Sequence, residues 1–272
     1  MNIFLNYLKR FRIAIIFAQI LTGIRVNIPR LKLFIQWMLR SREISTYTYK
    51  LNPLSRNYLI QTVALVTSEP LPLIEQYFLE IESNLELHQR IIDLLKASED
   101  RYKKDLRCDF GSRVAWYAII RALKLKVVVE NGVEQGLTAV VLNEAILKNA
   151  SEGFAGRYIG IDINSAAGYL VRDVCYSGFS QFIVDDALSA INQLDCEIDF
   201  YFSDGCRTVE YESREFNVLR QKLSAKSIGV SNKLRFSGEL SNLAKILGKR
   251  LVTFQEMPLD HWYDGSLIGI QF

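Results

Sequence analysis

The alternation of apolar and polar positions divides the chain into an apolar N-terminal stretch, a helical region and a series of strand–helix units. From residue 126 onward, short runs of β-branched and aromatic residues alternate with segments whose apolar residues recur at helical spacing. The runs predict strands at 126–130, 157–162, 181–184, 198–202, 226–230, 250–255 and within 265–272. Repeated strand–helix units predict a parallel α/β sheet, and two final strands without an intervening helix predict an antiparallel hairpin at its edge.

The region before these units is predicted to be mostly helical. Prolines at 53, 70 and 72 mark turns and helix starts between residues 47 and 107, and a helix at 111–125 leads into the first strand. Arg113 and Arg121 in that helix could bind a carboxylate or phosphate, but an exposed helix face is favoured. His88 is predicted to lie on the surface. We therefore divide the chain into an N-terminal segment (1–46), a helical cap (47–107) and an α/β domain (108–272).

Residues 1–42 are both apolar and basic, and we expect two helices separated near Pro29. The first apolar run has roughly a dozen residues, whereas a membrane-spanning helix needs about 20. Gly23-Ile24-Arg25 is a poor cleavage site, so a secretory signal is not expected. Two interpretations stay open: an amphipathic helix pair on an anionic membrane surface, or packing of residues 1–45 on the main domain or a second subunit. Nucleic acid is disfavoured, because the basic residues alternate with bulky aliphatic ones.

Composition and charge narrow the class of protein. Hydrophobic residues make up 49% and charged residues 23% of the 272, which is typical of a globular protein. Residues 1–50 hold nine basic residues and one acidic residue, Glu43, whereas the remainder holds 24 basic and 29 acidic residues. The four cysteines form no Cys-x-x-Cys pair, which favours a reducing, cytoplasmic location with membrane association still open. Two histidines exclude a histidine-rich metal site.

The candidate chemistry begins where the first strand ends. The strand at 126–130 ends at Glu130 and is followed by Gly132, Gly136 and a helix, as in nucleotide-type βα units. The two glycines would let the backbone approach a ligand closely. The spacing is Gly-x-x-x-Gly instead of Gly-x-Gly-x-x-Gly, and the acid would repel a diphosphate. A ligand with a positive end is therefore favoured.

Acidic residues also end the next three strands. Asp162 is expected to accept hydrogen bonds from both ribose hydroxyls of a nucleoside, although capping of a helix before Ser165 is an alternative. Asp185 and Asp186 follow the third strand, where either could cap the next helix. Asp204 follows the fourth strand. Since the carboxyl ends of parallel strands share one edge of a sheet, these acids predict a single ligand site.

The chain from about residue 47 resembles a bacterial family of class I S-adenosylmethionine (SAM)-dependent methyltransferases that modify sugars and natural products. The resemblance is carried by residues 111–121, 128–133, 160–164 with 167–168, 210–215, 260–263 and 269–270. It implies a Rossmann-like seven-stranded sheet and SAM as cofactor. By position, Glu130, Gly132 and Gly136 would hold the methionine end of SAM, Asp162 its ribose, and Asp186 with Ala187 its adenine. Val133, Ile163 and Asp185 would complete the cofactor site.

Two stretches depart from the family. Where relatives tend to show Asp-Ser-Asp-His after the fourth strand, this chain has Asp204-Gly-Cys-Arg207, and where they show Gly-Asp-Asn-Ala-His it has Gly229-Val-Ser-Asn-Lys233. Because Cys206 and Lys233 are not ligands that magnesium prefers, no metal site is expected.

Two functional hypotheses follow. The first is O-methylation of a small-molecule or glycan-like acceptor, metal-independent or weakly metal-dependent, with Asp204 and His261 as candidate proton acceptors. The second is an inactive methyltransferase-fold protein that serves as a binding or scaffold protein. A dehydrogenase is disfavoured by the glycine spacing and the terminal hairpin.

Overall fold

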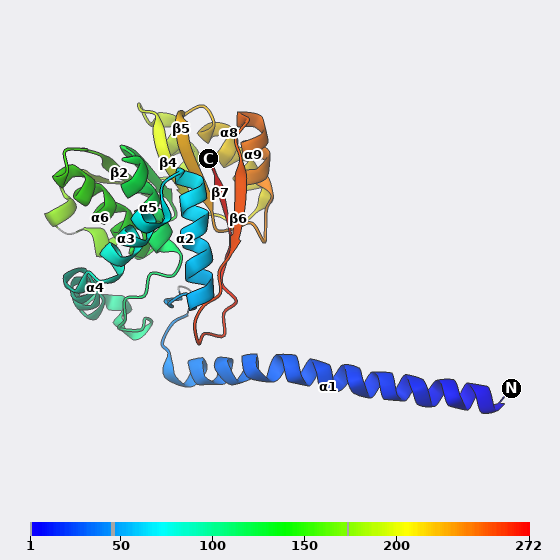
Figure 1. Ribbon diagram of the computed structural model, residues 1–272. Coiled ribbons are helices and arrows are strands. Elements are labelled where there is room, and N and C mark those ends of the chain that lie inside the picture. The colour runs from blue at the N-terminus through cyan, green and yellow to red at the C-terminus, as the bar shows by residue number, and fades with distance from the viewer. Residues whose placement is uncertain (1, 45–46, 173) are drawn as a thin grey trace.

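The computed structural model describes residues 2–44, 47–172 and 174–272 and contains a single mixed seven-stranded sheet. The strand order is β3-β2-β1-β4-β5-β7-β6 (Figure 1). The strands are β1 (Val127–Asn131), β2 (Arg157–Asp162), β3 (Ser180–Val184), β4 (Ile198–Ser203), β5 (Leu223–Ser231), β6 (Leu251–Gln255) and β7 (Leu267–Gln271).

The predicted division into parallel units and a terminal hairpin is confirmed. Strands β1 to β5 pair in parallel, and β7 runs antiparallel to both β5 and β6. A helix follows β1, β3, β4 and β5 in the chain, so each next strand can restart in the same direction. Only a loop joins β6 to β7, which forces the reversal. The seven strands, the parallel core and the antiparallel terminal hairpin agree with the Rossmann-like sheet that the resemblance implied.

Helices cover both faces of this sheet (Figure 1). They are α2 (Pro53–Thr67), α3 (Leu71–Glu82), α4 (Leu85–Ala97), α5 (Arg113–Leu123), α6 (Leu137–Ser151), α7 (Ala187–Gln193), α8 (Val209–Leu219) and α9 (Glu239–Leu247). Neighbouring strand residues alternate between the two cores, because side chains along a strand point to opposite faces. Val128 packs in the core under α5 and α6, and Val129 in the core under α7 to α9.

Helices α2 to α4, predicted as a cap, share one continuous core with the sheet. Leu59, Phe78 and Ile91 belong to the same buried cluster as Trp116 of α5 and Phe200 of β4. The boundary expected near residue 107 therefore does not separate two cores.

His88 of α4, predicted to lie on the surface, is only partly exposed. Its ring lies 5.2 Å from the ring of Phe110, and its Nε2 is buried without a hydrogen-bond partner among the described residues. Glu86 and Gln89, which lie close to His88 in the sequence, are exposed, whereas the His88 ring contacts Phe110.

The N-terminal segment is one helix, α1 (Asn2–Arg40), and not the pair expected from Pro29. Pro29 lies inside this helix. A proline removes one backbone hydrogen bond of a helix, but it does not always end the helix. The helix extends well away from the other elements (Figure 1), and every residue from 11 to 32 is exposed. The stretch Phe11–Arg40 is long and apolar enough to cross a membrane.

Glu43 connects the C-terminal end of α1 to the domain through hydrogen bonds. It is 4% exposed, and its carboxylate accepts hydrogen bonds from the Thr48 N–H (2.7 Å) and hydroxyl and from Trp37 Nε1 (3.3 Å). Burial alone would raise its pKa, but the nearby His261 ring and the hydrogen bonds from Thr48, with Arg107 also close, lower the pKa to about 2. A charged carboxylate is thus the organising group of this junction.

Candidate active site

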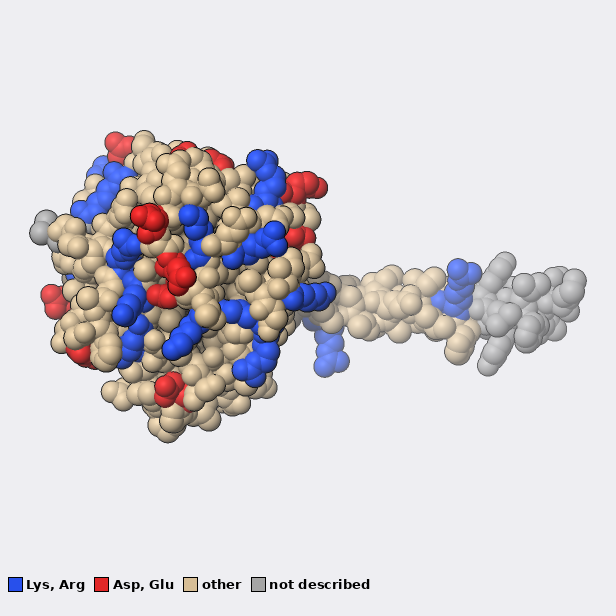
Figure 2. Space-filling view, turned by 90° about the horizontal axis from the view of Figure 1, so that it is seen from above, with Lys and Arg blue, Asp and Glu red and all other residues tan. Residues whose placement is uncertain are grey.

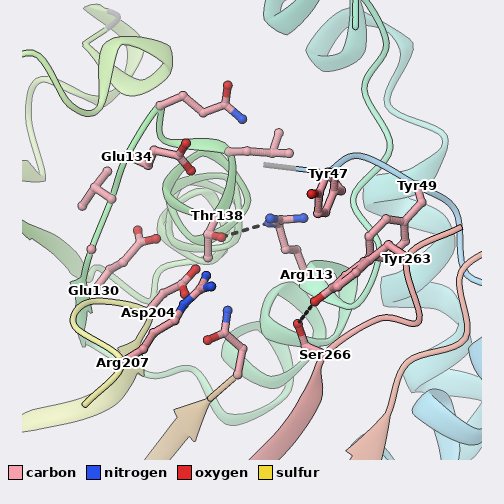
Figure 3. Close-up of a pocket in the computed structure, with 15 residues that line it drawn as sticks. Tyr47, Tyr49, Arg113, Glu130, Glu134, Thr138, Asp204, Arg207, Tyr263 and Ser266 are labelled. Carbon is pink, nitrogen blue, oxygen red and sulfur yellow. Dashed lines mark hydrogen bonds between the residues drawn. The ribbon is translucent and has the colours of Figure 1, made fainter. Parts of the chain in front are cut away.

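The candidate site is a groove along the carboxyl ends of the central strands, formed by two adjoining pockets. Both pockets are lined by Gly132, Glu134, Asp204 and Arg207. The first pocket is completed by Tyr47, Tyr49, Arg113, Glu130, Val133, Gln135, Leu137, Thr138, Asn232, Tyr263 and Ser266 (Figure 3). The second is completed by Asn131, Asp162, Ile163, Asn164, Asp185, Asp186, Ala187, Gly205, Cys206 and Tyr211. Eight of the nine cofactor residues predicted from the sequence line the groove, and so does Asp204.

Glu130 lies at the floor of the first pocket, at the end of β1. It is 1% exposed and accepts a hydrogen bond of 2.5 Å from the hydroxyl of Tyr158. Burial raises the pKa of Glu130 to about 8, with the Tyr158 hydrogen bond and Arg113 opposing the shift and Asp204 adding to it. Near neutral pH the carboxyl is therefore mostly protonated, and a cation placed beside it would favour its ionised form.

The loop after β1, which contains Gly132 and Gly136, is shaped by contacts with other parts of the protein. Gly132 has φ +86°, and a Cβ there would lie 2.8 Å from the backbone of Asp204 and Gly205. Gly132 lines both pockets, as expected for a glycine that a ligand approaches, and it also leaves room for the loop after β4. Gly136, at φ +99°, precedes α6 and packs against Gly168.

Asp162 holds the glycine loop from the end of β2. Its Oδ2 accepts hydrogen bonds from the N–H groups of Val133 and Glu134, both at 2.9 Å, and its Oδ1 accepts one from the Asn164 N–H. No helix starts at Ser165, so the alternative of a helix cap is wrong. Each carboxylate oxygen has two lone pairs, which leaves acceptor capacity for hydroxyls in the second pocket.

The two aspartates after β3 have different tasks. Asp186 caps α7, accepting from the Leu188 N–H at 3.0 Å, and also accepts from the Tyr211 hydroxyl at 2.8 Å. Asp185 accepts only the N–H of Asp186 (2.7 Å) among the hydrogen bonds found in the described residues. Asp185 is thus the freer acceptor, beside buried Ala187 and the 80% exposed Ile163.

Asp204 lies where the two pockets meet, beside Glu130 (Figure 3). Its N–H donates to the Asn131 carbonyl (2.8 Å), which aligns the loop after β4 with the end of β1. Within the described residues its Oδ1 is buried without a hydrogen-bond partner. Burial raises the pKa of Asp204, while Asn232 and the nearby guanidinium groups lower it. An unpaired carboxylate oxygen with a raised pKa is a candidate proton acceptor.

Arg113 is a pocket residue that the sequence interpretation assigned to an exposed face. It is half-buried at the start of α5, and its Nε donates to Thr138 Oγ1 of α6 at 3.0 Å (Figure 3). Arg121 from the same helix is 3% exposed and pairs with Glu152 at 2.7 Å, a structural ion pair. The sequence feature that could have identified Arg113 as a site residue is its position in the first turn of the helix that leads into β1.

Tyr47 and Tyr263 complete the first pocket and were not predicted as site residues. Their rings lie 5.0 Å apart, and the Tyr263 hydroxyl shares a hydrogen bond of 2.9 Å with Ser266. They come from opposite ends of the chain, so no local pattern connects them.

His261, predicted as a candidate base, does not line either pocket. It is 9% exposed; its Nδ1 accepts the Tyr263 N–H at 3.0 Å, and its Nε2 lies 3.7 Å from Glu43. The prediction selected the correct loop, because Tyr263 two residues later lines the first pocket. The imidazole points to the other side, into the junction with α1.

Lys233 joins the two loops in which the sequence departs from the related family. It is 1% exposed, donates to the Cys206 carbonyl at 3.1 Å, and lies 3.6 Å from Glu212 and 3.9 Å from Glu215. Glu215 also accepts hydrogen bonds from Tyr201 and Ser203. A buried ammonium group therefore ties the ends of β4 and β5 to α8.

Residues 129–231 match the protein family described as a methyltransferase domain. The solved structure of the O-methyltransferase TomG from Streptomyces achromogenes, in complex with SAM, is similar with a TM-score of 0.50, at 13% identity over 67% of this chain and 89% of that chain. The SAH-bound O-methyltransferase from Bacillus cereus has a TM-score of 0.45, at 11% identity over 68% of this chain and 91% of that chain. The SAH-bound methyltransferase from Podospora anserina has a TM-score of 0.43, at 15% identity over 66% of this chain and 85% of that chain. No curated protein matches this chain in sequence.

Proposed function

We propose that the protein transfers a methyl group from SAM to a hydroxyl of a small-molecule or glycan-like acceptor, because residues 129–231 match a methyltransferase-domain family and the fold is similar to that of a SAM-bound O-methyltransferase. The observation that carries the proposal is the continuous groove with Glu130, Asp162 and Asp185 at the ends of three neighbouring strands.

The residues of the groove suit the parts of SAM. The amino-acid end of SAM carries an ammonium and a carboxylate, and the first pocket supplies Glu130 for one and Arg113 for the other. In the second pocket, Asp162 has acceptor capacity for ribose hydroxyls, and Asp185 can accept from an exocyclic amine. Ile163, an exposed apolar side chain on the same pocket, can cover an aromatic ring. Bound SAM would supply an electrophilic methyl group on a positively charged sulfur.

The chain would contribute positioning and one proton acceptor. Methyl transfer depends chiefly on alignment of the acceptor oxygen with the methyl group, which can supply much of the rate enhancement. A hydroxyl loses its proton as it attacks, and Asp204 at the meeting point of the two pockets is the acceptor we propose. Tyr47, Tyr263 and Asn232 offer hydrogen-bonding groups for a polar acceptor in the first pocket.

Calorimetric titration of SAM into the full-length protein tests the cofactor site. We expect Asp185→Ala and Glu130→Gln each to weaken binding at least about tenfold, because each removes a charged or polar partner, at roughly 1.4 kcal/mol per tenfold change. Glu197→Gln is the matched control, since Glu197 is an exposed carboxylate that lines neither pocket.

Absence of SAM binding by the folded protein at millimolar cofactor would refute the proposal. The alternative, a binding or scaffold protein, is supported by the departures from the family pattern at residues 204–207 and 229–233. It predicts SAM binding without turnover, so SAH formation with a panel of hydroxyl acceptors separates the two functions.

A further inference from the structure

We propose that α1 is a membrane-spanning anchor that holds the methyltransferase domain at the surface of a lipid bilayer. The first observation is the exposure of its apolar residues. Phe11, Ile13, Phe17 and Val26 are each more than 60% exposed, and the whole stretch from 11 to 32 is exposed. A soluble monomer rarely leaves a contiguous apolar surface of this extent in water.

The apolar residues surround α1 instead of forming a stripe. Ile15, Ile16 and Phe17 are consecutive, so they point to three different sides of the helix, and all three are exposed. The basic residues are distributed in the same way: Arg30 and Lys32 are two positions apart and cannot share a face. A helix lying on a membrane surface, or packed in a soluble bundle, requires one polar face. The surface-lying amphipathic pair expected from the sequence is therefore not what the helix supports.

The length and ends of the helix suit a bilayer. From Phe11 to Pro29 the helix rises about 28 Å at 1.5 Å per residue, close to the hydrocarbon thickness of about 30 Å. Residues 13–24 carry no charge, and Arg12 and Arg30 lie near the two ends of the stretch. Figure 2 shows the projecting helix as a largely uncharged rod between basic side chains. Arg25 lies about 7.5 Å along the axis from Arg30, within reach of the interface for a long side chain.

Two polar side chains within the stretch form hydrogen bonds with the helix itself. The Thr22 hydroxyl donates to the Ala18 carbonyl at 2.8 Å, and the Asn27 amide donates to the Gly23 carbonyl at 2.7 Å. Such internal hydrogen bonds lower the cost of placing these groups in lipid, where no water is available. Pro29 is also compatible with a spanning helix.

Aromatic residues gather where α1 meets the domain, about 12 Å along the helix axis beyond Pro29. Trp37 lies 5.1 Å from Trp262 and 5.9 Å from Tyr47, and Tyr47 lies 5.0 Å from Tyr263. Tryptophan and tyrosine are enriched at membrane–water boundaries. Since Tyr47 and Tyr263 line the first pocket, the anchor would hold that pocket close to the bilayer surface.

Flotation with sealed phosphatidylcholine–phosphatidylglycerol vesicles tests the anchor in the full-length protein. We expect the wild-type chain to float and to stay bound after high salt and alkaline carbonate. Ile16→Glu with Ile20→Glu should lower the bound-to-free ratio at least about a hundredfold, because a charge at the helix centre opposes insertion. Leu65→Glu with Leu79→Glu is the matched control, with similarly exposed leucines on α2 and α3, and should bind as wild type.

Topology is read from an N-terminal epitope tag, which we expect to be protected from added protease while the domain is digested. Release by salt with an accessible tag would overturn the proposal in favour of surface binding. Equal flotation of the Ile16→Glu, Ile20→Glu variant and wild type would also overturn it. The proposal would also be overturned if the wild-type protein formed an oligomer without lipid and this variant did not. The partner of α1 would then be a second copy of the chain.

Discussion

We expect the buried carboxyl of Glu130 to make the stability of this protein fall as the pH rises through neutrality. In the unfolded chain the carboxyl has an ordinary pKa near 4.5, and in the folded protein burial raises it to about 8. Between these values the folded state holds a proton that the unfolded state has lost. The unfolding free energy therefore decreases by about 1.4 kcal/mol per pH unit until the folded carboxyl also ionises.

The magnitude over an accessible range follows from those two pKa values. From pH 6 to pH 9, Glu130 should cost the folded state about 3 kcal/mol, most of it lost before pH 8. Glu130→Gln removes this dependence, and its amide oxygen can still accept the hydrogen bond from Tyr158. The variant should therefore become more stable than wild type toward alkaline pH, by a difference that grows through the range.

Urea unfolding at a series of pH values, followed by tryptophan fluorescence, measures the two free energies. The difference between wild type and Glu130→Gln isolates this carboxyl from other titrating groups such as Asp204. Parallel stability curves from pH 6 to pH 9 would refute the reasoning, because they would mean that Glu130 is ionised in the folded protein. Under the proposed function, SAM binding at pH 7 should also release close to one proton, seen as a dependence of the calorimetric enthalpy on the buffer.

Three further predictions concern other buried charges. Asp204→Asn should lower kcat by about a hundredfold or more with SAM affinity unchanged, because it removes a proton acceptor; an unaltered kcat in a turnover assay would exclude that role. Lys233→Met should cost about 3–5 kcal/mol in urea unfolding, because it leaves Glu212 and Glu215 buried without their cation, whereas Lys233→Arg should cost less; equal losses would argue against a charge effect. Glu43 has its pKa lowered to about 2, so its contribution of about 3 kcal/mol is present above pH 4.5 and lost toward pH 2. Glu43→Gln should destabilise the protein at pH 7 but not at pH 2, and an equal loss at both values would contradict the linkage.

The sequence alone was sufficient for the order of the elements and for the edge of the sheet that carries the site. Strands and helices from residue 126 onward are marked by local periodicity, and the acids at 130, 162, 185 and 204 come at or just after strand ends. Parallel pairing then brings these positions together without further information. This is why the fold class and the acidic residues of the groove could be predicted.

The tertiary structure decided what each side chain does at that edge. Gly132 makes room for the loop after β4, Asp186 is occupied by α7 and Tyr211, and His261 faces Glu43 instead of the pocket. Each of these roles depends on a partner far away in the chain, which local spacing cannot reveal. Arg113 and Tyr47 were not predicted as site residues for the same reason, because their place in the first pocket depends on distant parts of the chain.

The N-terminal helix shows the same division between local and distant causes. Its apolar, basic composition was evident from the sequence, but Pro29 predicted a break that the helix does not have. Whether a proline ends a helix depends on the surrounding backbone and not on the proline alone. Only the three-dimensional arrangement shows that the apolar residues of α1 between positions 11 and 32 are left exposed, because exposure is a property of the whole fold and not of the residue type.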